Sequence, residues 1–228
     1  MKNQFYVSQN QVYKEAYLVV DYGLYKDYII LKNKKEKGFE ICEEKKESKK
    51  TDQEEIARVS NSRIKSKIKE LALCNDFEYF YTQTLKENRY DLDEFVLQIK
   101  KRFKAYKRKN KDFIYLIIFE KHKDGAYHLH GLVGGLGKDV YENQNGYLSL
   151  YDFEELGFNS LSKIKDKIKL SSYITKYITK DFVKTSSGYS YFHSKDLSFA
   201  RRFYLDDVDT IKLKLSFESE FIKIYKEQ

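Results

Sequence analysis

The sequence contains no run of apolar residues that approaches the roughly 18 needed to cross a bilayer. Its first residues, MKNQFYVSQNQVYKEAY, also lack the apolar core of a signal peptide. It has only two cysteines, Cys42 and Cys74, whose separation matches neither a metal site nor a redox motif. We therefore expect a cytoplasmic protein of a reducing compartment, without a membrane partner.

Charged and aromatic residues, in contrast, are abundant. Of the 228 residues 34% are charged, the formal net charge is +8, and there are 21 tyrosines and 16 phenylalanines. Basic side chains bind phosphates and exposed rings stack on bases, so this composition suits nucleic acid. A codon bias towards lysine and tyrosine would produce the same composition, and charge alone therefore does not decide the partner.

The length suits one large domain with an appendage. The charge run EEKKESKK at residues 43–50 predicts a solvated linker. We predict a β-rich appendage with this linker over residues 1–50, and a main domain over residues 51–228 that ends in a further strand or appendage. The appendage is expected to hold short strands at residues 16–21, 27–32 and 39–42.

Within the main domain, periodicity predicts alternating helices and strands. Thr51 to Glu54 forms a capping box that opens a helix to about residue 73, with an apolar stripe that starts at Ile56. Asp91 is positioned to cap a second amphipathic helix. Strands are expected at residues 78–85 and 113–119, an irregular connection at 138–160 and a short helix at 161–169.

The segment FIYLIIFEKHKDGAYHLHGLV, residues 113–133, reads as two strands joined by a tight turn. Side chains alternate along a strand, so His128 and His130 point to the same face. A two-residue turn would place Glu120 on the opposite face. A three-residue turn with Gly125 in the left-handed conformation pairs Glu120 with His128, and we predict this register because glycine adopts a positive φ without penalty.

Two neutral imidazoles and a carboxylate suit a divalent cation, namely Mn²⁺ or Mg²⁺, with Zn²⁺ as a further option. The alternative is a structural histidine pair beside an unrelated glutamate. The chain has four histidines in all, which makes a chance His-x-His pattern uncommon. We therefore predict a metal site at Glu120, His128 and His130.

A second helix is expected from Tyr173 to Phe182, capped by Ser171 or Ser172. At about 100° per residue, two phenols and two ammonium groups share one arc of this helix: Tyr173, Lys176, Tyr177 and Lys180. Such a pattern is also typical of an ordinary packed amphipathic helix. Next to a metal site it acquires a chemical meaning, because a phenol becomes an effective nucleophile once metal and cations stabilise the developing charge.

Taken together, these motifs resemble those of the HUH endonucleases, specifically the rolling-circle replication initiator (Rep) proteins of bacterial plasmids, phages and integrative elements. The resemblance extends from about residue 61 to residue 182 and combines the His-hydrophobic-His strand with the later Tyr-x-x-Lys-Tyr-x-x-Lys helix. It implies an α+β fold: a palm-like or RRM-like antiparallel sheet, with helices packed on one face and the tyrosine helix next to the metal-binding strands.

The resemblance also implies roles for individual residues. Metal ligands would be His128, His130 and Glu120; nucleophiles would be Tyr177, which we favour as the primary one, and Tyr173, assisted by Lys180 and Lys176. Its first motif corresponds to the strand with Thr82 and Thr84, which together with Arg63 would contact DNA. Two departures are Gln83, where an apolar residue is expected, and no helicase segment after residue 182.

The implied activity is metal-dependent nicking and joining of single-stranded or hairpin origin DNA through a 5′-phosphotyrosine. Host helicase and polymerase would act in trans, and the protein would be a monomer or weak dimer. Alternatives are a single-tyrosine transposase of the same superfamily and a nucleic-acid-binding module without catalysis. A cupin-like metal enzyme is disfavoured because the chain has no proline and its only later histidine, His193, is distant.

Overall fold

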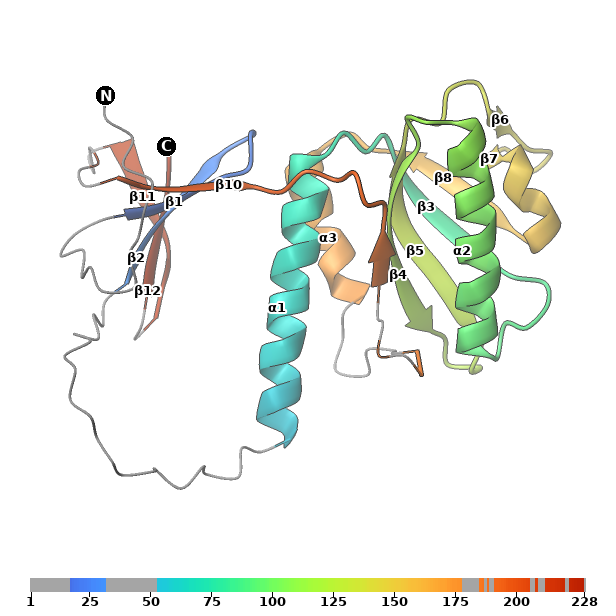
Figure 1. Ribbon diagram of the computed structural model, residues 1–228, viewed down its shortest axis with the longest axis horizontal. Coiled ribbons are helices and arrows are strands. Elements are labelled where there is room, and N and C mark those ends of the chain that lie inside the picture. The colour runs from blue at the N-terminus through green and yellow to red at the C-terminus, as the bar shows by residue number, and fades with distance from the viewer. Residues whose placement is uncertain are drawn as a thin grey trace. The chain divides into compact units, whose positions relative to one another are not determined.

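The computed structural model describes residues 17–31, 53–177, 185–186, 188, 191–205, 208, 212–219 and 222–227. Two units make up the chain: a terminal unit, residues 1–51 and 199–228, and a central unit, residues 52–198. Both contain an antiparallel sheet, and the fold is α+β as predicted (Figure 1). The capping box at Thr51, the charge run and the expected strand at 39–42 lie outside the described residues.

The terminal unit is a sheet in the strand order β10-β1-β2-β12-β11. Its strands are β1 (Tyr17–Asp21), β2 (Lys26–Leu31), β10 (Arg201–Leu205), β11 (Leu213–Glu218) and β12 (Ile222–Glu227). The predicted strands at 16–21 and 27–32 are confirmed as β1 and β2. Val19 and Tyr28 are buried opposite each other. Burial and the hydrogen bond that the Tyr28 hydroxyl donates to Glu227 raise the pKa of this phenol to about 12.

The central unit contains a sheet in the order β6-β7-β8-β3-β5-β4-β9. Its strands are β3 (Tyr79–Thr84), β4 (Ile114–Lys121), β5 (Tyr127–Gly134), β6 (Val140–Glu142), β7 (Leu148–Leu150), β8 (Asn159–Lys163) and β9 (Tyr191–His193). β3, β4 and β5 confirm the strands expected at residues 78–85 and 113–133. They lie next to one another in the order β3-β5-β4, so the histidine strand is the middle one of the three.

Two segments differ from the prediction. Residues 138–160 are not an irregular connection, because they form β6, β7, the 3₁₀ helix η1 (Tyr151–Leu156) and the start of β8. The helix predicted over residues 161–169 is also wrong, since Leu161 lies in β8 opposite Tyr81 of β3. Asn159 and Leu161 are buried two residues apart, which is the period of a strand.

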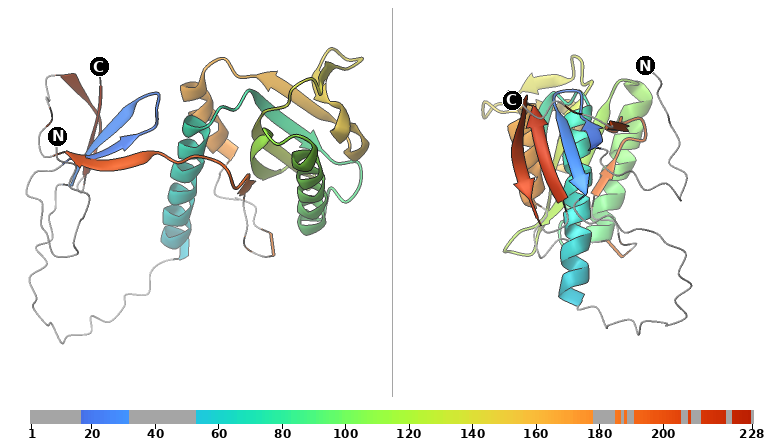
Figure 2. Two further views of the ribbon diagram at one scale, coloured as in Figure 1. Left: turned by 45° about the horizontal axis from the view of Figure 1, so that its top comes forward. Right: turned by 90° about the vertical axis from the view of Figure 1, so that its left-hand side faces the viewer.

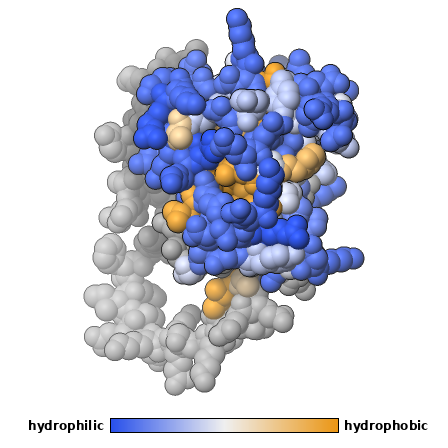
Figure 3. Space-filling view, turned by 90° about the vertical axis from the view of Figure 1, so that its right-hand side faces the viewer, coloured by the Kyte–Doolittle hydropathy of each residue, from blue (hydrophilic) through white to orange (hydrophobic). Residues whose placement is uncertain are grey.

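Helix α2 (Leu92–Lys109) covers one face of the central sheet (Figures 1 and 2). It begins where predicted, because the Asp91 side chain accepts a hydrogen bond of 3.1 Å from the Glu94 amide. Six side chains at helical spacing are buried: Leu92, Phe95, Val96, Ile99, Phe103 and Tyr106. The outward surface on this side is mostly hydrophilic, with only small apolar areas (Figure 3). Core packing therefore positions α2.

The opposite face of the central sheet packs against α1 (Gln53–Cys74) and α3 (Lys167–Ile174). Ile68 and Leu71 of α1 are fully buried in a cluster with Leu116, Leu132 and other apolar residues of the sheet and α3. Ile56, expected in the same stripe, is 55% exposed, so the prediction was wrong there. None of the helices in the described part of the chain is both long and apolar enough to span a membrane.

Gln83, the polar residue at a position where an apolar one was expected, is fully buried on the α2 side of β3. Its side-chain oxygen accepts a 2.5 Å hydrogen bond from the Tyr81 hydroxyl, and its amide donates to the carbonyls of Thr84 and Phe158 at 3.1 Å. All these groups are therefore satisfied without water. The departure from the expected pattern has a structural cause.

Removing one partner of this buried network should cost more than removing both. We expect Gln83→Leu to lower the free energy of unfolding by about 1–3 kcal/mol, because the Tyr81 hydroxyl and two carbonyls lose their partner. Adding Tyr81→Phe should recover part of the loss, giving a coupling energy of about 0.5–3 kcal/mol. Urea unfolding of the two single variants and the double variant measures this; strict additivity would contradict the network.

Candidate functional site

The turn between β4 and β5 has the predicted three-residue geometry. His122 donates a backbone hydrogen bond of 2.8 Å to Ala126, and Gly125 donates one of 2.9 Å back to His122. Gly125 has a φ of +88°, which a glycine adopts without strain. Glu120 lies opposite His128 in the strand register. The expected register is confirmed, and Glu120 shares the face of the histidines.

Four chemically active side chains meet at this end of the sheet: Glu120, His122, His128 and His130. The Glu120 carboxylate accepts a 2.9 Å hydrogen bond from Nε2 of His130 and lies 4.0 Å from Nε2 of His122. The rings of His122 and His128 are stacked, with centroids 3.6 Å apart and planes 17° from parallel. His130 is the most enclosed of them, with 12% of its side chain exposed.

The environment favours the neutral form of two of these histidines. Burial is the main cause that lowers the pKa of His128, and the charges that His122 and His130 could carry act in the same direction. Burial also lowers the pKa of His130, although the neighbouring Glu120 opposes this shift. A neutral imidazole has a free lone pair, which is the form that ligates a metal.

The donor set fits a divalent cation in its chemistry: a carboxylate oxygen and imidazole nitrogens, with one carboxylate–imidazole pair already 2.9 Å apart. Within the described residues, however, no three His, Cys, Asp or Glu side chains are arranged as a ready metal site. Glu120 is bonded directly to His130, and His128 faces His122 instead. A three-ligand set would thus require small side-chain rotations at this hairpin.

Thr82 and Thr84, expected to contact DNA, lie directly opposite His130 and His128 in the register of β3 and β5. Their hydroxyls are 3.2 Å and 3.0 Å from Nδ1 of the respective imidazole. The structure therefore joins these two threonines to the histidines. The sequence analysis did not foresee this contact, although the matching Thr-x-Thr and His-x-His patterns on paired strands are its signal.

The helix that carries the tyrosines is shorter and starts earlier than predicted. α3 begins at Lys167 with Asp166 as its cap, and it passes at Thr175 into the 3₁₀ helix η2 (Thr175–Tyr177). Ser171, proposed as a cap, lies inside α3, where its hydroxyl donates to the carbonyl of Ile168. The Thr175 hydroxyl likewise donates to Ser172, a local bond that competes with regular helix.

Tyr173 is close to the histidine strand through one intervening ring. Phe80 stacks on His130 with centroids 5.8 Å apart, and the edge of the same ring contacts Tyr173 at 5.7 Å. The Lys176 ammonium lies 5.2 Å from the centre of the Tyr173 ring. Tyr173 is 43% exposed. A substrate phosphate can therefore reach this phenol from solvent on the face that carries His130.

The remaining predicted site residues are not joined to this group by the structure. Tyr177 ends η2, but its side chain lies outside the description, as does Lys180 together with the rest of the helix expected to residue 182. Arg63 is exposed on α1. The proposed roles of these three residues rest on the sequence alone.

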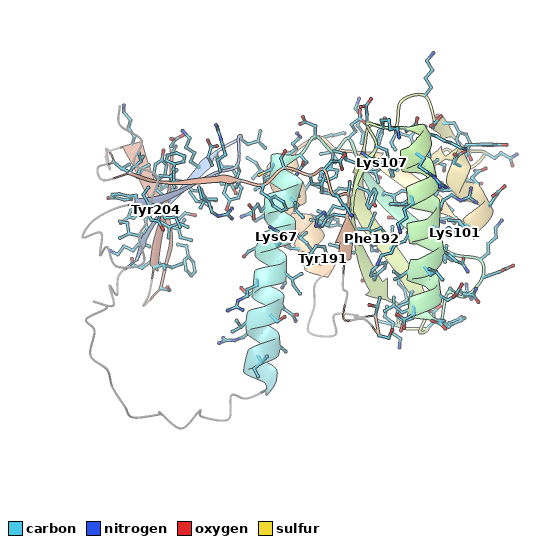
Figure 4. All side chains as sticks on the ribbon, viewed as in Figure 1. Lys67, Lys101, Lys107, Tyr191, Phe192 and Tyr204 are labelled. Atoms are coloured by element: carbon cyan, nitrogen blue, oxygen red, sulfur yellow. The ribbon has the colours of Figure 1, made fainter. Side chains whose placement is uncertain are left out.

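One strand beside the site was missed altogether. β9 pairs with β4 and places Tyr191 opposite Ile118, on the face of the histidines. Burial raises the pKa of Tyr191, so this phenol stays protonated. Phe192 points to the other face, under α2, where the Lys100 ammonium lies 5.5 Å from its ring (Figure 4). Three residues of alternating character are too few to predict a strand.

The fold and site together define a class: an antiparallel sheet with two histidines and a carboxylate on one face, next to a helix that carries a tyrosine. Residues 78–182 match the model of a family described as replication-associated protein of the ORF2 type. The match covers just under half of the chain and includes β3 to β5, β8 and α3. No curated protein and no solved structure matches the chain. The matched segment thus agrees with the replication-associated part of the resemblance seen in the motifs.

Proposed function

We propose that this protein initiates replication by nicking and rejoining single-stranded origin DNA through a covalent tyrosine intermediate. The observation that carries the proposal is the placement of Tyr173 beside Phe80, which stacks on His130, which is bonded to Glu120. These four residues lie within the segment that matches the replication-associated family. A structural histidine pair would not need an accessible phenol one ring away.

Each protein group has a distinct task in this proposal. The phenol of Tyr177 or Tyr173 attacks the scissile phosphorus, forming a Tyr O–P bond while the bond to the 3′ oxygen breaks. The phenolic proton passes to water, and the 3′ oxygen takes up a proton as it leaves. Lys176 and Lys180 offset the negative charge that develops on the phosphate.

His128, His130 and Glu120 would hold a divalent cation, Mn²⁺ or Mg²⁺. When bound, such an ion supplies Lewis-acid polarisation of a phosphoryl oxygen. The histidines contribute by remaining neutral, and Glu120 contributes the negative charge that favours a cation over a second proton. The phosphotyrosine keeps the 5′ end on the protein, and the free 3′-OH can prime synthesis.

The second tyrosine, one turn away, would allow a second transfer without release of DNA. Rejoining after one round of synthesis needs such a step, because the displaced strand must be cut and closed again. Unwinding and synthesis would come from a helicase and a polymerase of the host. Single-stranded or hairpin DNA is the expected substrate, since a phenol on a sheet face reaches a phosphate of an exposed strand.

The test is incubation of the protein with fluorescent single-stranded oligonucleotides, drawn from hairpins that flank its coding region, in Mn²⁺ or Mg²⁺. We expect a species of reduced mobility in a denaturing gel that carries the label of the downstream fragment and disappears on protease treatment. DNA binding that is indifferent to EDTA and gives no covalent species with any hairpin would instead support a binding module without catalysis.

A further inference from the structure

Two threonines and two histidines form a repeated pair across β3 and β5. Thr82 lies opposite His130 and Thr84 opposite His128, and each hydroxyl lies at Nδ1 of its partner, at 3.2 Å and 3.0 Å. The same contact therefore occurs twice, two residues apart, on one face of the sheet. In antiparallel strands, directly opposed side chains are the closest cross-strand neighbours, so the backbone register itself fixes these contacts.

A partner at Nδ1 decides which nitrogen each ring presents to the site. With Nδ1 engaged by a threonine on β3, Nε2 is left facing away from that strand, and Nε2 of His130 indeed lies 2.9 Å from Glu120. Histidines that bind metal through Nε2 need the other nitrogen held by a hydrogen-bond partner, which sets both ring orientation and tautomer. Here that partner would be a hydroxyl in both cases.

A hydroxyl is particularly suited to this place because it both donates and accepts hydrogen bonds. While Nε2–H of His130 donates to Glu120, Nδ1 must accept, and the Thr82 hydroxyl can donate to it. When Nε2 serves as a ligand, Nδ1 carries the proton, and the same hydroxyl can accept. A carboxylate could partner only the second tautomer, and an aliphatic side chain could partner neither.

This arrangement also bears on the expected role of the two threonines in DNA contact. Their hydroxyls are already engaged by imidazoles, and His130 is mostly enclosed, so the contact is shielded from water. Gln83 between them is turned into the core and bonded to Tyr81. The Thr-x-Thr segment of β3 thus serves the histidine strand on one face and the core on the other.

We infer that Thr82 and Thr84 are positioning residues that orient His130 and His128 for metal binding through Nε2 and support both tautomers of each ring. This inference rests on the proposed function, because it assigns the two histidines to a metal. It gives the first motif a structural task in the site instead of a role in reading origin sequence. Loss of such partners typically weakens metal affinity by about 10- to 100-fold.

The test uses the full chain with Thr82→Val and Thr84→Val, singly and together, because valine keeps the branched shape and removes the hydroxyl. Mn²⁺ affinity is measured by calorimetry, and imidazole tautomers of the metal-free protein by ¹⁵N NMR. We expect the double variant to bind Mn²⁺ about 10- to 100-fold more weakly, with altered tautomer populations at His128 and His130. Thr→Ser at both positions should restore affinity to within a few-fold.

Ser160→Ala is the matched control, because Ser160 lies opposite Thr82 on the β8 side, on the same sheet face but one strand further from the histidines. It should leave both readouts unchanged. Unchanged Mn²⁺ affinity and tautomers in the valine variants would overturn the inference, as would a loss confined to DNA affinity in EDTA. If the wild type binds no Mn²⁺ through His128 and His130, the proposed function fails first, and the two failures are thereby distinguished.

Discussion

Replacing Tyr173 and Tyr177 together by phenylalanine should reduce formation of the covalent protein–DNA species to below roughly a thousandth of the wild-type rate. A tyrosine nucleophile has no substitute in the mechanism, and loss of a nucleophile typically costs several orders of magnitude. Removal of two hydroxyls should leave the fold intact, because Tyr173 is 43% exposed and its ring contact with Phe80 is kept in phenylalanine.

The single variants divide the work between the two phenols. We expect Tyr177→Phe to cause the larger loss, because the motif resemblance assigns it the first attack, and Tyr173→Phe to impair the second transfer. Mass spectrometry of the trapped peptide identifies the attached residue. Tyr151→Phe, at a tyrosine that is 72% exposed on η1, is the control and should react normally. Persistence of the adduct in the double variant would refute the assignment.

The second large effect concerns the histidine strand. We expect His128→Ala combined with His130→Ala to abolish metal-dependent nicking, with a loss of roughly 1000-fold. Metal polarisation of a phosphoryl oxygen is worth several kcal/mol, and each ~1.36 kcal/mol corresponds to a factor of ten. EDTA should impose the same loss on the wild type. Binding of single-stranded DNA should change little, because it depends on basic side chains.

His193→Ala provides the matched control. His193 lies on β9 of the same sheet, and its Nδ1 contacts the carbonyl of Ser194 at 2.6 Å, away from the Glu120 group. Thermal unfolding of each variant checks that the fold survives the smaller side chains. Nicking that continues at the wild-type rate in the double alanine variant, or in excess EDTA, would show that the histidines are structural.

Local chemistry made much of the central unit predictable. Asp91 opens α2 as expected, and the six apolar residues of that helix are buried at the expected spacing. Gly125 settled the turn between β4 and β5, and with it the face on which Glu120 lies. In these segments a single residue type with one preferred conformation determined the local structure.

Other parts depend on partners that the sequence does not name. β7 and β8 hold buried polar residues typical of loops, yet Asn159 accepts from the Leu150 amide at 2.7 Å and Ser149 donates to the Asn159 carbonyl. Their burial is possible only because each group is satisfied by the other strand. Likewise, the two threonines read as a DNA-contact motif until the register placed them against the histidines.

The pairing of β1 with β10 brings Tyr17 opposite Leu205, so the central unit is in effect inserted between two neighbouring strands of another sheet. During synthesis the ribosome releases the whole of residues 52–198 before β10, β11 and β12 exist. The central unit can then fold while β1 and β2 still wait for their partners. Contacts so distant along the chain form slowly, so the terminal sheet should be the last piece to assemble and the first to misassemble when translation is interrupted.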